Sequence, residues 1–138
     1  MISEFRFLVI CQGAMQRTDD HLVTLSGIVN EITTSASERT PLLAVVGLIL
    51  RPAMKGKRLD LIAWSFGKTG EPEPLDGYVG APLFLPDGLG PQTLPCEIAL
   101  PIKRDGIYGF FLFDRDGVFG PKEDLLATYM FSATIVDS

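Results

Sequence analysis

The sequence predicts an all-β protein, an antiparallel β-sandwich of about eight short strands in a Greek-key or jelly-roll arrangement, with little helix. Short segments rich in Val, Ile, Leu and aromatic residues recur along the chain, and Gly, Pro or Asp turn residues bound them. No segment of useful length has the apolar period of an amphipathic helix. The chain has 138 residues and no linker or internal repeat, so we expect a single β-sandwich domain over residues 1–138.

The expected strands cover residues 4–11, 22–32, 42–50, 58–66, a short irregular stretch within 76–85, 96–102, 107–114 and 129–136. Gly27, in the middle of the second strand, indicates a bulge or a close approach of another backbone. Pro82 restricts the fifth strand to the edge of a sheet. The segment 86–95 is rich in proline and glycine and is expected to be irregular.

Residues 107–113 are expected to form a central strand, because they are dense in aromatic residues and lie between the turn pairs Asp105-Gly106 and Asp116-Gly117. Tyr108 has two interpretations. It could be a tyrosine corner, in which the hydroxyl bonds back to the upstream backbone, or a core residue after a plain type I′ hairpin turn.

An immunoglobulin domain proper is not expected. Its pattern places a Trp soon after the first Cys and the second Cys just past the corner Tyr. Here Trp64 lies far downstream of Cys11, and Cys96 precedes the corner position.

Two segments, 42–50 and 107–113, are apolar on both faces, whereas a strand in a two-layer sandwich normally buries one face. The outer faces must be covered by the long loops 67–95 and 118–126 of the same chain, or by another subunit. Apolar residues make up 46% of the chain, which favours cover by another chain. The expected interaction surface consists of Tyr108, Phe110, Leu112, Leu43, Val45 and Ile49.

The net charge of −5 argues against a nucleic-acid partner, since phosphate binding needs a clustered basic face. The basic residues within 51–58 are interpreted as a solvated turn. The N-terminus lacks the features of a signal peptide, and no apolar run is long enough to span a membrane. We therefore expect a cytoplasmic protein without a membrane or nucleic-acid partner.

No catalytic, metal-binding or cofactor-binding residue is expected. His21, the one histidine, lies at an acidic turn and is interpreted as solvated rather than as a general base. Cys11 and Cys96 lack the spacing and the histidine partners of a zinc site, and are expected to be buried thiols rather than a disulfide. The run from Asp114 to Gly117 begins like a calcium loop, but the later ligands are missing, so it is interpreted as a polar turn.

These features favour a non-enzymatic protein-binding or assembly module that self-associates through an apolar sheet face or an edge strand. The alternative is a small-ligand sandwich, for example one that binds carbohydrate, with Trp64 or Tyr78 as an aromatic platform beside the long loops. An enzyme is the least favoured function.

Several stretches resemble a large bacterial family of small β-sandwich proteins known only as a domain of unknown function. The likeness lies in residues 8–32, LVICQGAMQRTDDHLVTLSGIVNEI, in the strand start 41–46, and in Gly106-Ile107-Tyr108 followed by Asp116-Gly117. The chain departs from the family at Gln12, where an acidic residue is frequent, and its Gly-rich element shrinks to Gly27. The resemblance implies a cytoplasmic bacterial β-sandwich and carries over no catalytic residue.

Overall fold

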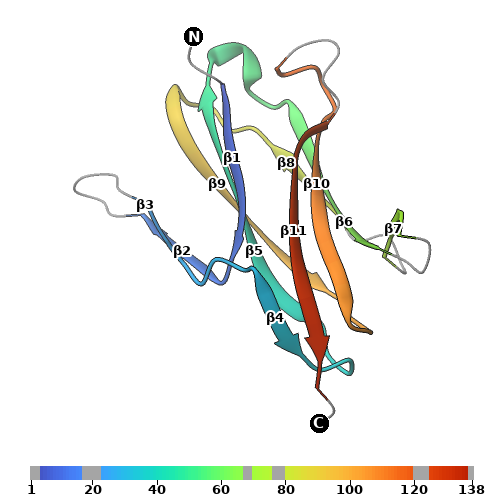
Figure 1. The fold of residues 1–138 in the computed structure, drawn as a ribbon. Helices are drawn as coiled ribbons and strands as arrows, with labels where there is room; N and C mark the ends of the chain where they lie inside the picture. The colour runs from blue at the N-terminus through green and yellow to red at the C-terminus, as the bar shows by residue number, and fades with distance from the viewer. Residues whose placement is uncertain (1–3, 17–22, 67–69, 76–79, 120–124, 137–138) are drawn as a thin grey trace.

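The computed structural model describes residues 4–16, 23–66, 70–75, 80–119 and 125–136 (Figure 1). The strands are β1 (Phe5–Cys11), β2 (Gly13–Gln16), β3 (Val23–Ser26), β4 (Glu31–Thr34), β5 (Thr40–Leu50), β6 (Arg58–Phe66), β7 (Pro72–Pro74), β8 (Gly80–Phe84), β9 (Gly90–Leu100), β10 (Gly106–Asp114) and β11 (Leu125–Ile135). The one helical element among these residues is a 3₁₀ turn, η1 (Pro52–Met54).

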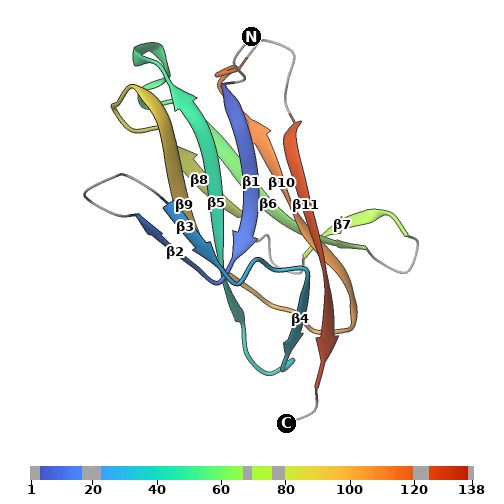
Figure 2. The same cartoon turned by 60° about the vertical axis from the view of Figure 1, so that its left-hand side comes forward.

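The strands form two facing sheets and a separate hairpin (Figures 1 and 2). One sheet has the order β1-β5-β9. The other has the order β4-β11-β10-β6-β7, with β8 also paired to β6. The predicted all-β sandwich is confirmed, although with eleven strands among the described residues rather than about eight. It is not wholly antiparallel, because β4 and β11 pair in parallel.

The strand order is that of an immunoglobulin-like sandwich. Such a sandwich places strands A, B and E side by side in one sheet and C, F and G in the other. Here β1, β5 and β9 occupy the A, B and E places, and β6, β10 and β11 occupy those of C, F and G. The sequence lacks the Cys-Trp-Cys pattern of an immunoglobulin domain proper and does not predict a strand order. The fold is reached without that pattern because apolar packing between the sheets replaces the disulfide.

The core lies between the two sheets and is built from alternate residues of each strand. Ile10, Leu48, Leu61, Phe110 and Leu112 are all fully buried there. Residues on the inner faces point at one another across the sandwich, so each strand contributes every second side chain to a single apolar layer.

The predicted strand 22–32 is interrupted at Gly27, and the two halves belong to different sheets. β3 pairs with β2, whereas β4 pairs with β11. Gly27 has a φ of 67°, and a Cβ there would lie 2.7 Å from Oε1 of Gln12. The close approach that the glycine indicated is therefore confirmed, with the side chain of Gln12 as the neighbour.

The prediction that residues 86–95 are irregular is wrong for its second half. β9 begins at Gly90 and contains both Pro91 and Pro95. It pairs only with β5, so it is an edge strand of its sheet. Prolines are tolerated at such an edge, where an amide N–H would face outward, and they make the edge a poor template for a further strand. Pro82 likewise lies in β8, which pairs only with β6, as its edge assignment predicted.

Of the two interpretations of Tyr108, the tyrosine corner is confirmed. β9 and β10 belong to different sheets, so no hairpin joins them. The Tyr108 hydroxyl donates a 2.7 Å hydrogen bond to the carbonyl oxygen of Arg104. The bond fixes the connection that crosses from one sheet to the other.

Replacing Tyr108 with Phe keeps the buried ring and removes only this hydrogen bond. We expect the free energy of unfolding to fall by about 1–2 kcal/mol, because the carbonyl of Arg104 loses its partner. Urea denaturation measures the change, with the slope of the transition as a check on the denatured state. A midpoint equal to that of the wild type would show that the corner contributes nothing to stability.

Candidate interaction surface

Three of the predicted surface residues, Tyr108, Phe110 and Leu112, lie in the core, and that prediction is wrong. They are 3%, 0% and 0% exposed. β10 lies between β11 and β6, and its even-numbered residues point towards the opposite sheet. The outward set consists of the other face of the same strand, with Ile107, Gly109, Phe111 and Phe113.

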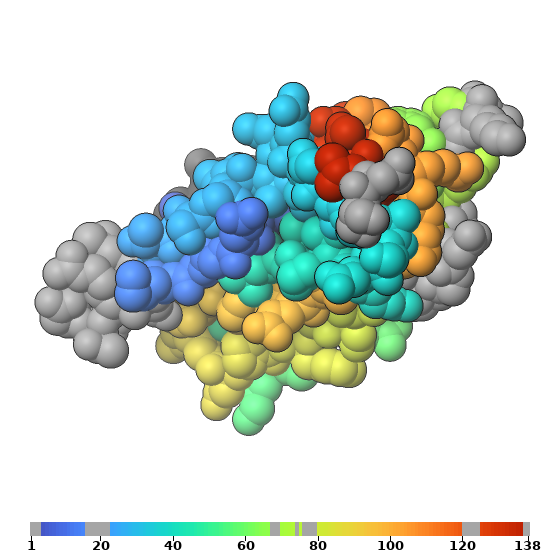
Figure 3. All heavy atoms as spheres, turned by 90° about the horizontal axis from the view of Figure 1, so that it is seen from below, coloured from blue at the N-terminus to red at the C-terminus, as the bar shows by residue number. Residues whose placement is uncertain are grey.

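Leu43, Val45 and Ile49 do lie on the outer face of β5, but this chain covers much of that face. Val45 is fully buried, and Leu43 and Ile49 are half-buried. The β2–β3 hairpin extends from the body of the protein beside this sheet, as Figures 1 and 3 show in blue. Leu43 and Val45 lie at the bottom of a hollow of about 270 Å³ between the hairpin and the sheet.

The aromatic platform predicted for a sugar fails at Trp64, which is only 2% exposed. The indole lies on the outer side of β6 but is covered by its neighbours. Phe66 meets it edge-on at 4.7 Å between ring centroids, and Phe111 stacks on it at 5.1 Å. Its Nε1 is buried and has no hydrogen-bond partner in the described part of the chain. Tyr78, the other platform residue, lies outside the described residues, as does His21.

These contacts belong to a continuous row of rings on the outer face of β6 and β10. We call the row of Phe66, Trp64, Phe111, Phe113 and Arg115 the aromatic ladder. Phe111 and Phe113 meet at 5.9 Å, and the guanidinium carbon of Arg115 lies 4.7 Å from the centre of the Phe113 ring. Aromatic and cation–π contacts of this kind add to the stabilisation that burial provides.

Asp60 fixes the Arg115 end of the ladder. Arg115 Nε lies 3.0 Å from Oδ2 of Asp60, and Arg58 Nε lies 3.2 Å from Oδ1 of the same carboxylate. A carboxylate shared by two guanidinium groups holds Arg115 over the Phe113 ring. The ladder is therefore ordered by pairing as well as by packing.

Around the ladder, the outer face of the six-stranded sheet exposes apolar side chains of β6 and β10 and Met130 of β11, which lies between Thr128 and Ser132. Ile107 is 39% exposed and Met130 56% exposed, and Phe66, Phe111 and Phe113 are each half-buried. Pairing of Gly109 with Met130 and of Phe111 with Ile62 places these side chains on one face. We call this surface the outer strip; it consists of Ile62, Phe66, Ile107, Phe111, Phe113 and Met130.

The acidic run after β10 stabilises its own turn, as the polar-turn interpretation predicted. Asp114 is 2% exposed and accepts hydrogen bonds from the amides of Val118 at 2.8 Å and Phe119 at 2.9 Å. Asp116 accepts a 2.7 Å bond from the amide of Arg58. No group of three His, Cys, Asp or Glu side chains within the described ranges could hold a metal ion.

Both cysteines are free thiols, as predicted, but only Cys11 is buried as expected; Cys96 is half-buried. Cys11 pairs with Leu43 and Cys96 with Ala44, so β5 separates them and they point to opposite faces of the sheet. That geometry excludes a disulfide between them. Burial raises the pKa of Cys11 and of Cys96, and the carboxylate of Glu97 raises the pKa of Cys96 further. Both thiols are therefore protonated, and weak as nucleophiles, at neutral pH.

Comparison with known proteins gives a structural likeness but no family. No protein-family model matches the chain, and no curated protein matches it. A crystal structure of an immunoglobulin-like protein from Pseudomonas aeruginosa is similar to it, with a TM-score of 0.39 and 13% sequence identity over 90% of each chain. No helix in the described part of the structure is long and apolar enough to cross a membrane.

Proposed function

We propose that this protein is a non-enzymatic binding and assembly module that self-associates through the outer strip. The observation that carries the proposal is the ladder of rings on β6 and β10, ordered by Arg115 and Asp60 and bordered by the exposed side chains of Ile107 and Met130. An apolar patch on regular, hydrogen-bonded strands is the kind of surface that proteins use for association.

Self-association through the apolar outer strip is energetically more favourable than pairing through the strand edge at β9. Burying a few hundred Å² of apolar surface contributes several kcal/mol, at about 25 cal/mol per Å², before the entropy lost on association. The rings of the ladder are already held by one another, so little side-chain freedom remains to be lost. The edge at β9 is blunted by Pro91 and Pro95, which makes it a poor site for pairing with a further strand.

The test places a charge in the strip without disturbing the core. Met130 is exposed, so Met130→Lys leaves the packing between the sheets intact. We expect the wild type to form dimers at tens of micromolar in sedimentation velocity, and Met130→Lys to weaken the association at least tenfold, by desolvation of the added charge.

The matched control is Leu89→Lys, at an apolar residue that is 69% exposed and lies outside the strip. We expect this variant to dimerise with the same dissociation constant as the wild type. A wild-type protein that stays monomeric at tens of micromolar overturns self-association. Equal effects of the two lysines would overturn the assignment of the interface to the outer strip.

The other parts of the proposal rest on the sequence alone. We propose that the chain is related to the bacterial family of small β-sandwich proteins, on the likeness of residues 8–32, 41–46, 106–108 and 116–117, and that its location is cytoplasmic. The net charge of −5 favours a protein partner over a nucleic acid.

A further inference from the structure

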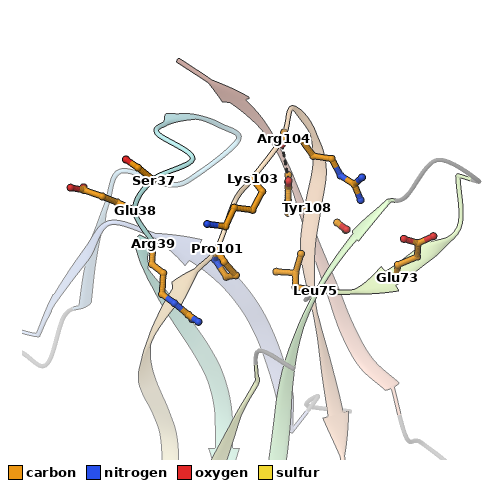
Figure 4. Close-up of a pocket in the computed structure, with 10 residues that line it drawn as sticks. Ser37, Glu38, Arg39, Glu73, Leu75, Pro101, Lys103, Arg104 and Tyr108 are labelled. Carbon is orange, nitrogen blue, oxygen red and sulfur yellow. Dashed lines mark hydrogen bonds between the residues drawn. The ribbon is translucent and has the colours of Figure 1, made fainter. Parts of the chain in front are cut away.

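A polar cavity opens at one end of the sandwich, away from the outer strip. It measures about 570 Å³ and lies where the β4–β5 and β9–β10 connections and the β7 segment come together (Figure 4). Figure 3 views this end of the molecule from below. The residues that matter for its chemistry are Arg39, Ser65, Glu73, Leu75, Lys103 and Arg104.

Ser65 gives the cavity a buried polar floor. It follows Leu61 and Ala63 on the inner side of β6 and pairs with Tyr108 of β10, so it lies between the sheets. Ser65 is only 5% exposed, and it makes no hydrogen bond to the residues that the structure describes. Because Ser65 lines the cavity, its unpartnered hydroxyl can bond to water or to a group that enters.

Arg104 is held at the mouth by its own backbone. Its carbonyl accepts the hydrogen bond of the Tyr108 corner, which fixes the backbone at this residue. Its guanidinium forms no ion pair within the described ranges, and Figure 4 shows it extending on the Tyr108 side of the cavity. An unpaired guanidinium suits a carboxylate or a phosphate, which it can bind through two parallel hydrogen bonds.

Two further cations lie at the same opening. Lys103 Nζ donates to the carbonyl oxygen of Ala36 at 3.1 Å, and Arg39 Nη1 donates to that of Ala99 at 3.3 Å. Those bonds orient the side chains but leave their charges uncompensated. The lining also contains Glu38 and Glu73; neither forms an ion pair with these cations, and Glu38 points away from Lys103 in Figure 4.

We propose that this cavity binds a small molecule through a carboxylate or phosphate group, with Arg104 and the Ser65 hydroxyl as direct ligands of the oxyanion. Lys103 and Arg39 supply the positive potential that attracts an anion to a protein of net charge −5. Leu75 and Pro101, which also line the cavity, contact the carbon skeleton of the ligand. Glu73 disfavours anions with a second negative charge on that side.

The test is a titration of ¹⁵N-labelled protein with sodium phosphate and, separately, with sodium acetate, at an ionic strength held constant with sodium chloride. We expect saturable shifts of the amide signals of Ser65 and Arg104 with at least one of the two. The one that saturates at lower concentration identifies the group that the site prefers. The absence of a saturable shift up to about 50 mM of either salt overturns the proposal.

The variants separate this site from general electrostatic attraction. Arg104→Gln should weaken binding at least tenfold, and Ser65→Ala several-fold. Arg6→Gln removes the same charge from an exposed position on β1 and should leave binding unchanged. Equal losses in Arg104→Gln and Arg6→Gln would overturn the site. Because no residue of the outer strip is altered, the Met130→Lys experiment on self-association stands or fails separately.

Discussion

Replacing Phe110 with Ala is expected to destabilise the protein by about 3–5 kcal/mol. The ring is fully buried at the centre of the sandwich and stacks against Phe131, at 6.4 Å between centroids. Its removal leaves a cavity that the two regular sheets cannot close by collapse. Urea unfolding followed by far-ultraviolet circular dichroism measures the loss, and a protein this strongly affected would be partly unfolded at 37 °C.

The matched variant is Phe111→Ala, at the next residue along the same strand. Phe111 is half-buried in the aromatic ladder on the other face. We expect a smaller loss of stability, about 1–2 kcal/mol, together with weaker self-association, because part of the ring already faces water. If Phe111→Ala proved more destabilising than Phe110→Ala, our assignment of the two faces of β10 would be wrong.

This pair of residues shows where prediction from the sequence succeeded and where it stopped. Aromatic density and the flanking Asp-Gly pairs predicted the strand at 107–113, and the strand at 58–66 matches β6 at both ends. A period of two also divided β10 correctly into two sets of side chains. It could not say which set faces the other sheet, because both are apolar and the answer depends on the neighbouring layer.

One signal for the direction was present at Gly109. It lies in the outward set of β10, and its missing side chain makes room for the Trp64 ring on that face. A glycine in a central strand commonly marks a close approach by another group. Combined with the tyrosine corner, which requires Tyr108 to point inward, it would have identified the outer face.

The polar cavity at the end of the sandwich could not be predicted from the sequence, for a different reason. Arg39, Ser65 and Arg104 lie on three separate connections or strands, and no local motif joins them. They meet only because β5 and β10 begin, and β6 ends, at the same end of the sandwich. The short strand β2 was missed as well, since Gly13–Gln16 is too short to show alternation.

The two faces of β10 are coupled through the backbone that they share. Phe110 packs in the core. On the other face, Phe111 contributes a ring to the ladder, and Gly109 leaves room for the ring of Trp64. A change that moves β10 outward would therefore disturb the core and the outer strip together. For this reason, variants intended to test association should alter exposed residues such as Met130, and not residues of the ladder that are packed against Gly109.

Gly109→Ala is the variant that should disturb both faces at once. A Cβ at this position would clash with the carbonyl oxygen of Tyr129 and lie 2.7 Å from Cζ2 of Trp64. The carbonyl belongs to the adjacent strand β11, so it cannot move without breaking the pairing of the sheet. The Trp64 ring is confined by Phe66 and Phe111 and has no free direction in which to turn.

We expect Gly109→Ala to lower the free energy of unfolding by about 3 kcal/mol, at the upper end of the range for overpacking, and the melting temperature by about 10 °C. Scanning calorimetry measures both, and a red shift of Trp64 fluorescence would report the displaced indole. The control is Gly56→Ala, where a Cβ meets nothing within 4 Å but the φ is 76°. That variant should lose only about 1 kcal/mol, from backbone strain. If the two alanines proved equally tolerated, the β10–β11 pairing would be looser than the register of Gly109 with Met130 requires.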